Sequence, residues 1–315
     1  MTSSKTVKTR FCIISDTHNR APWPATSTQY AYRAPLPSAD VLLHAGDITR
    51  TGGTTEYEGM LDVLRQSDAE LKIVIAGNHD ITLDEAYYNS SGWRKHRLAR
   101  EDLRRVRKMW TGEEARKAGI MYLDEGVNTF TLKNGAKFTI YTSPYTPEFC
   151  NWAFQYERDQ DRYNPAPAAA QFKPPNPIPS WPQVDLMLTH GPPYQILDRA
   201  YHGEDVGCEH LLKAAARVRP RLHCFGHIHE GWGAERVTWT GERRKEAAQI
   251  DRQTVLADRS AVLDLSKDGG NPLEFGKETV FVNAAIMNVA YIPGNAPWSV
   301  DLDLPLAEGS GSGGA

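Results

Sequence analysis

Short apolar runs recur along the chain, and several of them end abruptly in polar residues. The run 71–76, LKIVIA, is typical of a buried parallel strand and leads directly into Gly77-Asn78-His79-Asp80. Two earlier runs behave in the same way, at 10–15 before Asp16-Thr17-His18 and at 39–45 before Gly46-Asp47. Taken alone, each polar group could be an ordinary turn. Because open α/β sheets bind ligands at the carboxyl ends of their strands, the repetition predicts a shared site.

The second half of the chain continues this pattern. The runs 184–189 and 221–225 lead into His190-Gly191 and into Gly226-His227-Ile228-His229. Two alternating runs within 127–142 flank Asn134-Gly135, a pair that favours a tight hairpin turn. We interpret 279–286 and 298–304 as edge strands of a second sheet. His44 and His223 lie inside strand runs, and we expect them to be structural.

Helical periodicity is expected in three places. A helix from Thr54 or Thr55 to about Ser67 would carry its apolar side chains on one face. Between two strands, it implies a right-handed parallel crossover. The segments 93–117 and 206–218 are also expected to be helical. The first is rich in Arg and Lys, which could bind a phosphate-rich partner, but interspersed acidic residues favour a solvated helix face.

We expect a single domain over 10–304, with a disordered N-terminus at 1–9 and a flexible tail at 305–315. Two insertions are expected, near 157–182 and 241–278. The first contains seven prolines within 164–182, which exclude regular structure there. Just before it lie five aromatic residues that could either line a pocket or pack a long loop: Tyr145, Phe149, Trp152, Phe154 and Tyr156.

Composition narrows the class of protein. The chain has 315 residues, 40% of them hydrophobic and 24% charged, as in a soluble globular enzyme. A net charge of -3 provides no basic excess for general nucleic-acid binding. The four cysteines show no CxxC spacing, so we expect reduced and mostly buried thiols. With no signal-like segment and no long apolar run, we expect a cytoplasmic protein that does not bind membranes.

The polar groups in order are DxH, GD, GNHD, THG and GHxH. This ordered set resembles the calcineurin-like metallophosphoesterase superfamily. The stretches THGPP, VGCEHLL, RPRLHCFGHIHEGWG and FVNAAIMN are similar to its MPPED-type metallophosphodiesterase subgroup. The resemblance covers about 11–304 without the two insertions. It implies an α/β fold, a four-layer αββα sandwich with two mixed β-sheets.

Seven residues are candidate metal ligands, too many for one tetrahedral site. They are Asp16, His18, Asp47, Asn78, His190, His227 and His229. The resemblance implies a division in which Asp16, His18, Asp47 and His229 hold one metal and Asp47, Asn78, His190 and His227 hold the other. The nitrogen and oxygen donors suit Mn, Fe or Zn, and also Co or Mg. Two ions ~3.5–4 Å apart would lower the pKa of a bridging water and hold phosphoryl oxygens.

The resemblance further implies that His79 protonates the leaving group after attack by the metal-bridging hydroxide. Asp80 either orients His79 or braces the turn. The protein phosphatases of the superfamily carry GDxVDRG and GNHE, whereas this chain has GDITRTG and GNHD, so a protein phosphatase is disfavoured. We therefore expect hydrolysis of phosphodiesters, with cyclic nucleotides as one candidate class. The alternatives are a small-metabolite phosphomonoesterase, other chemistry at the same centre, or a metal-binding scaffold with vestigial activity.

Overall fold

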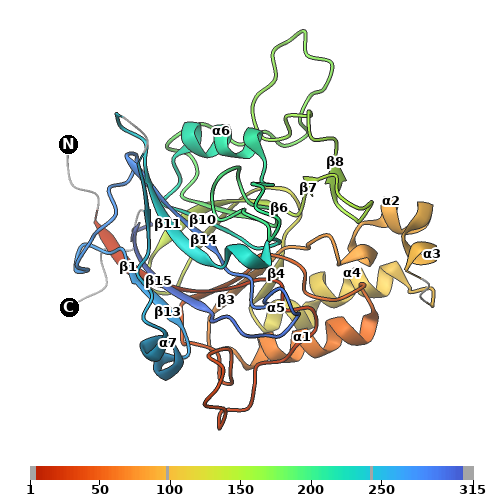
Figure 1. The fold of residues 1–315 in the computed structure, drawn as a ribbon, viewed down its shortest axis with the longest axis horizontal. Coiled ribbons are helices and arrows are strands. Elements are labelled where there is room, and N and C mark those ends of the chain that lie inside the picture. Colours follow the sequence, from red (N-terminus) through yellow and green to blue (C-terminus); the bar gives the residue numbers. More distant parts are fainter. Residues whose placement is uncertain (1–4, 97–98, 242–243, 308–315) are drawn as a thin grey trace.

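Two large β-sheets form the centre of the molecule (Figure 1). The computed structural model describes residues 5–96, 99–241 and 244–307. The six-stranded sheet has the order β13 (Ala261–Asp264), β15 (Trp298–Pro305), β1 (Thr6–Ile14), β2 (Val41–His44), β3 (Leu71–Val74), β4 (Ile120–Tyr122). The seven-stranded sheet has the order β12 (Arg244–Ala247), β11 (Gly233–Thr238), β14 (Glu278–Asn283), β10 (Leu222–Phe225), β9 (Leu186–Thr189), β6 (Lys137–Ser143), β5 (Gly126–Thr131).

The main core lies between the facing surfaces of the two sheets. Phe11, Val41 and Ile73 of the first sheet belong to the same buried cluster as Ile140 and Leu222 of the second. Successive side chains of a strand point to opposite faces, so the alternate residues pack outward against helices. The apolar runs at 10–15 and 71–76 are continuous because these strands are buried on both faces.

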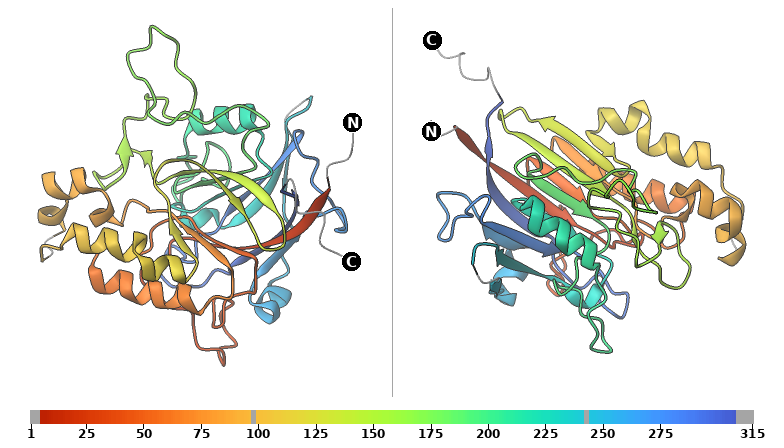
Figure 2. Two further views of the ribbon diagram at one scale, coloured as in Figure 1. Left: turned by 180° about the vertical axis from the view of Figure 1, so that it is seen from behind. Right: turned by 90° about the horizontal axis from the view of Figure 1, so that it is seen from above.

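Helices cover the two outer faces. The first sheet packs on α1 (Thr54–Gln66), α4 (Leu103–Thr111) and α5 (Glu113–Lys117), through residues such as Met60, Val106 and Ala115. The second sheet packs on α6 (Glu209–Val218) through Leu211 and Ala214. The layer order is therefore helix, sheet, sheet, helix, and the two further views show the sheets lying face to face (Figure 2). The four-layer αββα fold with two mixed sheets is confirmed.

The two C-terminal strands do not lie where the sequence pattern placed them. β14 lies inside the second sheet, between β11 and β10, and β15 lies inside the first sheet, between β13 and β1. The prediction that both are edge strands of a second sheet is wrong. An alternating or buried run shows that a strand has one or two covered faces, but it does not say which strands pair with it. The hairpin of β5 and β6 around Asn134-Gly135 is confirmed.

The segment 241–278 was expected to be an irregular insertion, yet it completes both sheets. Its strands β12 and β13 are edge strands, and α7 (Arg252–Asp258) lies between them. Residues 6–9 belong to β1 and pair with β15, so they are not part of a disordered N-terminus. Residues 1–4 and 308–315 lie outside the described part of the chain. The proline-rich excursion within 157–182 has no helix or strand in the structure and extends away from the body at the top of Figure 1.

The segment 93–117 is not one helix. It contains α3 (Trp93–Lys95), α4 and α5, and Gly112 separates the last two. Residues 97–98 lie outside the described part. Before α3 come α2 (Glu85–Tyr87) and a π-helical turn, η2 (Tyr88–Gly92). All four cysteines are free thiols, three of them buried. Over the described residues, no helix combines the length and apolarity that a membrane crossing requires.

Candidate metal centre

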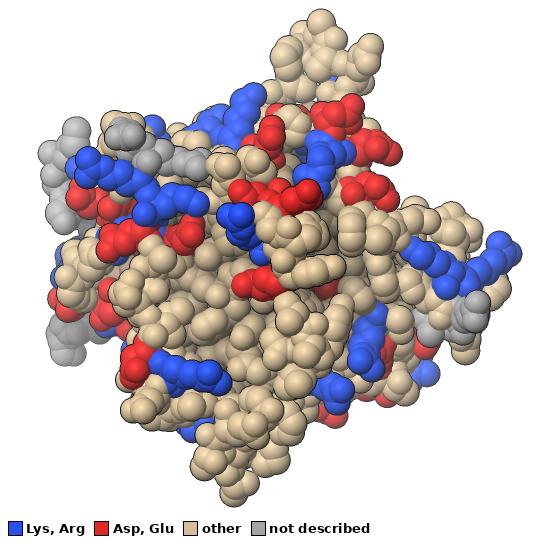
Figure 3. Space-filling view, viewed as in Figure 1, with Lys and Arg blue, Asp and Glu red and all other residues tan. Residues whose placement is uncertain are grey.

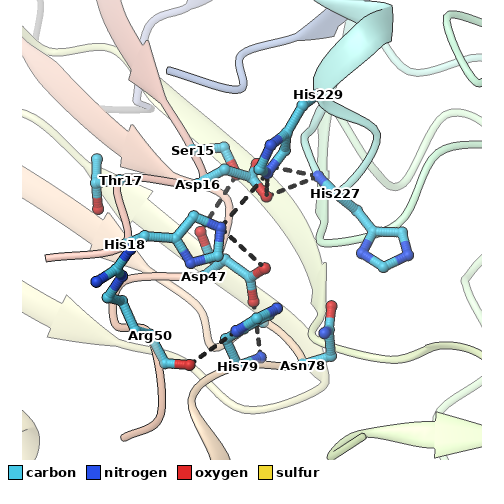
Figure 4. A network of polar contacts seen from close by, with 12 residues as sticks. Ser15, Asp16, Thr17, His18, Asp47, Arg50, Asn78, His79, His227 and His229 are labelled. Carbon is cyan, nitrogen blue, oxygen red and sulfur yellow. Dashed lines mark hydrogen bonds and ion pairs between the residues drawn. The ribbon is translucent and has the colours of Figure 1, made fainter. Parts of the chain in front are cut away.

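The strand ends of both sheets meet at one edge of the sandwich. β1, β2 and β3 are parallel, as are β6, β9, β10 and β14, so the carboxyl ends within each set lie together. The two sets are joined by hydrogen bonds from Ser15 N to Ala284 O (2.9 Å) and from Ile286 N to Ser15 O (2.8 Å). All seven candidate ligands follow these strand ends and gather at this edge (Figure 4 labels Asp16, His18, Asp47, Asn78, His227 and His229).

Asp47 occupies the middle of the cluster. Its Oδ2 lies 3.7 Å from Nε2 of His18, and its Oδ1 lies 3.3 Å from Nε2 of His190. His190 Nε2 lies 2.9 Å from Oδ1 of Asn78. The two oxygens of one buried carboxylate therefore face two different histidines, one after a strand of each sheet.

Asp16 lies beside Asp47 and contacts the GHxH loop (Figure 4). Its Oδ1 is 3.4 Å from Nε2 of His229, and its carboxylate accepts hydrogen bonds from the backbone N–H of His227 at 3.0 and 3.1 Å. Three groups of side chains present ligand atoms within 4.8 Å of one another: Asp16, His18 and His229; Asp47, His190 and His227; and His18, Asp47 and His79. The first two follow the division that the sequence resemblance implied.

Backbone carbonyls hold three of these histidines in one tautomer. The Nδ1 atoms of His18, His190 and His229 lie 3.0, 2.9 and 3.3 Å from the carbonyl oxygens of Thr49, Ala45 and Asn288. A carbonyl only accepts, so in the neutral rings Nδ1 carries the proton and Nε2 keeps its lone pair. Each Nε2 lies near an acidic or amide oxygen of the cluster, which is the arrangement of metal-ligating histidines.

Burial and nearby charges set the protonation states of the histidines and aspartates at the centre. Burial lowers the pKa of His18 to about 4 and that of His227 to about 3, so both rings are neutral near pH 7. Burial opposes ionisation of Asp16 and Asp47. For Asp16, the hydrogen bond and charge of His229 in its doubly protonated form outweigh that effect; for Asp47, the charge of the doubly protonated form of His190 leads. These effects lower the pKa of both carboxyl groups. Neutral imidazoles and ionised carboxylates are the forms that bind metals.

The backbone at the centre is strained. Asp16, His18, Asp47 and His227 all have left-handed φ angles, of 51°, 43°, 51° and 65°. Each such residue costs on the order of 1 kcal/mol or more, and strain of this kind clusters at functional sites. Gly226 allows the close approach of its loop, because a Cβ there would overlap the Asp16 carboxylate and the Ser15 hydroxyl.

Comparison with known proteins agrees with this geometry. The sequence model described as "Calcineurin-like phosphoesterase" matches residues 9–231. The chain belongs to the calcineurin-like phosphoesterase family. It is 32% identical over 312 residues to "Metallophosphoesterase domain-containing protein 1" of Homo sapiens, covering 94% of this chain and 72% of that protein. It is also 34% identical over 206 residues to "UPF0046 protein T07D4.2" of Caenorhabditis elegans, covering 63% and 48%. The MPPED-like subgroup is thereby confirmed.

Another similar protein is the "Probable rhamnogalacturonate lyase C" of Emericella nidulans, 33% identical over 248 residues, which are 78% of this chain but 19% of that protein. Among solved structures, the phosphopantetheinyl hydrolase of Mycobacterium tuberculosis aligns with a TM-score of 0.39 at 20% identity, covering 75% of this chain and 87% of the other. Family membership and the His/Asp groups support a divalent metal centre and phosphoester hydrolase activity.

In this phosphoesterase, Asp80 braces two loops. Its buried carboxylate accepts hydrogen bonds from the backbone N–H groups of Gly77 (2.8 Å), Ile48 (3.1 Å) and Thr49 (2.9 Å), and from the Thr49 hydroxyl (2.7 Å). Burial, with the charge of Asp47, raises the pKa of Asp80 to about 7, although these donors oppose the shift. Of the two roles left open by the sequence, the structure favours the brace over a partner of His79.

The ring of His79 is held by other groups. Its Nδ1 lies 2.8 Å from the carbonyl oxygen of Arg50, and its backbone N–H donates to Asp47 Oδ1 at 2.8 Å. The ring meets that of His18 edge-on at 4.7 Å and stacks on Trp152 at 4.0 Å. The ring of Tyr291 lies 5.2 Å from the rings of both His18 and His229.

Sequence reasoning did not assign Tyr291 to the site, and it left Trp152 in a group of five aromatics. The sequence of a loop does not indicate which of its aromatic side chains will contact a strand end that is distant in sequence. His44 and His223 are structural, as expected. His44 lies 2.9 Å from the hydroxyl of Thr17, between the ligands Asp16 and His18, and His223 lies 2.8 Å from the hydroxyl of Thr189, the residue before the ligand His190. Burial lowers the pKa of both rings.

Proposed function

We propose that this protein hydrolyses phosphodiester bonds of small substrates at a two-metal centre, with cyclic nucleotides as a candidate class. The observation that carries the proposal is the position of Asp47, whose Oδ2 faces His18 and whose Oδ1 faces His190. A carboxylate in that position suits a bridge between two cations. The remaining six donors then fall on either side of it.

The donor set fits two divalent ions. Asp16 and Asp47 are buried and adjacent, and two like charges so placed are favourable only when cations compensate them. Four imidazoles and one amide oxygen complete a set of nitrogen and oxygen donors without sulfur, which suits Mn, Fe or Zn, and Co or Mg as well. The proposed division is Asp16, His18, Asp47 and His229 for one ion, and Asp47, Asn78, His190 and His227 for the other.

When bound, such ions supply Lewis acidity to phosphoryl oxygens and lower the pKa of water. The chain itself orients the donors through backbone carbonyls and moves one proton. His79 lies next to the ligand Asn78 and presents Nε2, while its Nδ1–H donates to the Arg50 carbonyl. We assign it to protonating the leaving oxygen, a general-acid role. Since Nδ1–H is occupied, donation from Nε2 requires the doubly protonated ring.

A diester is favoured over a monoester by the charges around the centre. Over the described residues, no Lys or Arg side chain hydrogen-bonds to any of the seven proposed ligands or to His79; Arg50 contributes its carbonyl. A dianionic monoester commonly receives such additional cations, whereas a monoanionic diester needs fewer. On the face shown in Figure 3, acidic and basic residues are interspersed around a broad uncharged area, and neither sign dominates that face. A phosphomonoesterase is the second candidate.

Metal analysis tests the centre. Purified protein should contain about two ions per chain, and a chelator should remove both the metal and the activity. Asp47→Asn should lose at least one ion and most activity, whereas the exposed Asp62→Asn serves as a matched control. A fully loaded and active Asp47→Asn protein would refute the bridge. A panel of diesters and monoesters at saturating metal separates the two candidate functions, and metal without turnover on any ester would indicate a scaffold.

The role of His79 has its own test. An alkoxide leaving group should gain on the order of 10²–10⁴-fold from a general acid, and a nitrophenolate much less. His79→Ala should therefore keep both metals and lose more activity on a cyclic nucleotide than on a nitrophenyl diester. Equal losses on the two substrates would contradict the acid role. Loss of a metal would instead make His79 a metal ligand, a role that its proximity to His18 and Asp47 permits.

A further inference from the structure

Trp152 has a different environment from its aromatic neighbours in sequence. Tyr145, Phe154 and Tyr156 pack in or against buried clusters, and Phe149 is 66% exposed. Trp152 also packs against such a cluster, but its ring in addition stacks on His79, with centroids 4.0 Å apart and planes 27° from parallel. Of the five aromatics, it is the one whose ring reaches the metal centre.

The loop that carries Trp152 is built to hold one conformation. It connects β7 (Thr146–Pro147) with β8 (Gln155–Tyr156). Cys150, Asn151 and Phe154 have left-handed φ angles of 56°, 51° and 54°, which are costly for residues other than glycine. The backbone N–H of Trp152 donates to Oε1 of Gln155 at 2.9 Å. Such strain persists only where the surroundings enforce it.

A second segment supplies that enforcement. The run from α2 through the π-helical turn to α3 packs against the outer side of the loop. Tyr87 donates its hydroxyl proton to the Asn151 carbonyl at 2.8 Å, and Lys95 donates to the carbonyls of Asn151 (2.6 Å) and Cys150. His96 packs on the Trp152 ring at 4.2 Å. π-Helical turns are rare in proteins, and those that occur are often found at functional sites.

The His79 ring is thus constrained in three directions. The Arg50 carbonyl fixes the ring within its plane, His18 meets it edge-on, and Trp152 covers a face. A proton donor must point at its acceptor to be effective, and small misplacements of a reacting group can cost large factors in rate. Without Trp152, one face of the His79 ring would be free, and the ring could rotate about the Cα–Cβ bond. The stacked indole opposes that rotation.

We propose that Trp152 is a positioning residue, which acts by holding His79 in the orientation from which it protonates the leaving oxygen. This inference rests on the proposed general-acid role of His79. It extends that role to a loop far from the five ligand-bearing strand ends in sequence. It also gives a function to the α2–α3 segment, which supports the loop without touching the proposed ligands.

The test compares Trp152→Leu, Trp152→Phe and the matched control Phe149→Leu from the same loop. Two substrates are used at saturating metal, a 2′,3′-cyclic nucleotide with an alkoxide leaving group and methyl p-nitrophenyl phosphate. Trp152→Leu should lower kcat/KM for the cyclic nucleotide by on the order of 10-fold, mainly through kcat, and that for the nitrophenyl ester by much less. Trp152→Phe should retain most of the wild-type kcat/KM, because it keeps an aromatic ring that can stack on His79. Phe149→Leu should leave kcat/KM unchanged for both substrates.

A double-mutant cycle decides whether the effect passes through His79. In a His79→Ala background, Trp152→Leu should cause no further selective loss. Metal content and circular dichroism check that each variant is loaded and folded. Equal losses on both substrates, or a loss that persists without His79, would overturn the inference while leaving the acid role intact. If His79→Ala alone affects both substrates equally, the general-acid role fails first, and the positioning role with it.

Discussion

Replacing Asp80 by asparagine tests whether this residue is a structural brace. The side chain keeps its shape, but one carboxylate oxygen becomes an NH₂ group that donates instead of accepting. If the amide nitrogen takes the place of Oδ2, the backbone N–H groups of Gly77 and Ile48 lose their acceptor. The alternative orientation removes the acceptor of the Thr49 backbone N–H, whereas the Thr49 hydroxyl can rotate and accept from the amide. The first orientation therefore leaves two backbone donors facing another donor inside the protein, and the second leaves one.

The cost follows from the donors that lose their acceptor. A buried donor left without a partner costs about 1–3 kcal/mol, and the cheaper orientation leaves one such donor. Burial raises the pKa of the Asp80 carboxyl group to about 7, so replacing the charged carboxylate by a neutral amide offsets part of this cost. We expect Asp80→Asn to lower the free energy of unfolding by about 1–2 kcal/mol, and Asp80→Ala by more, because it removes all four acceptor contacts.

Urea unfolding of the metal-free protein at pH 8 is the appropriate assay, because the carboxylate is ionised there and metal binding does not contribute. Asp62→Asn, whose side chain is 68% exposed, should stay within about 0.5 kcal/mol of the wild type. A change of less than about 0.5 kcal/mol in Asp80→Asn, together with a leaving-group-dependent loss of activity, would refute the brace and return Asp80 to the role of a partner of His79.

Three other predictions concern different parts of the molecule. Burial opposes ionisation of Asp301, but its ion pairs with Arg10 and Lys8 lower its pKa below the usual 3.8. Asp301→Asn should therefore cost about 1 kcal/mol at pH 7 in urea unfolding. The difference should start to shrink as the pH falls to about 4 and disappear once the pH is below the lowered pKa of the folded protein. Gly226→Ala should abolish metal binding, measured by elemental analysis, while circular dichroism stays native; retained metal would contradict the close approach to Asp16. Replacing 166–173 by a short Gly-Ser linker should leave substrate preference unchanged on a panel of diesters. The residues at the two ends of this proline-rich excursion, Asn164, Ile178 and Ser180, hydrogen-bond to Arg217 and not to the metal centre. A changed preference would show that the excursion reaches the substrate.

The ligand-bearing strand ends could be predicted because each requires a local pattern, an apolar run followed by a polar group. Such patterns are visible without knowledge of the fold. The pairing of strands is different, since β14 and β15 have ordinary apolar runs whose neighbours lie far away in sequence. The edge strands β12 and β13 are short and partly exposed, so their alternation of apolar and polar residues is too weak to predict a strand. For this reason the sequence pattern indicates an irregular insertion at 241–278.

Contacts that depend on three-dimensional packing could not be predicted. The partners of Asp80 include backbone groups about thirty positions earlier in the chain, and backbone donors leave no mark in a sequence. Trp152 and Tyr291 reach the centre from loops whose courses depend on strained backbone, with Tyr291 itself at φ 55°. For Trp152, the available signal was its place in an aromatic-rich stretch after a strand end.

The hydrogen bonds of Ser15 to Ala284 and Ile286 have a mechanical consequence. They fasten β1 to the segment after β14 at the edge where the ligands gather, so the two sheets cannot slide past each other there. The edge strands β12 and β13 each pair with a neighbour on one side only. The ligands carried by the two sheets are therefore expected to keep their relative positions in the metal-free protein, while the edge strands open more readily. In hydrogen exchange, the amides of Ser15 and Ile286 should then be among the last to exchange, and those of β12 among the first.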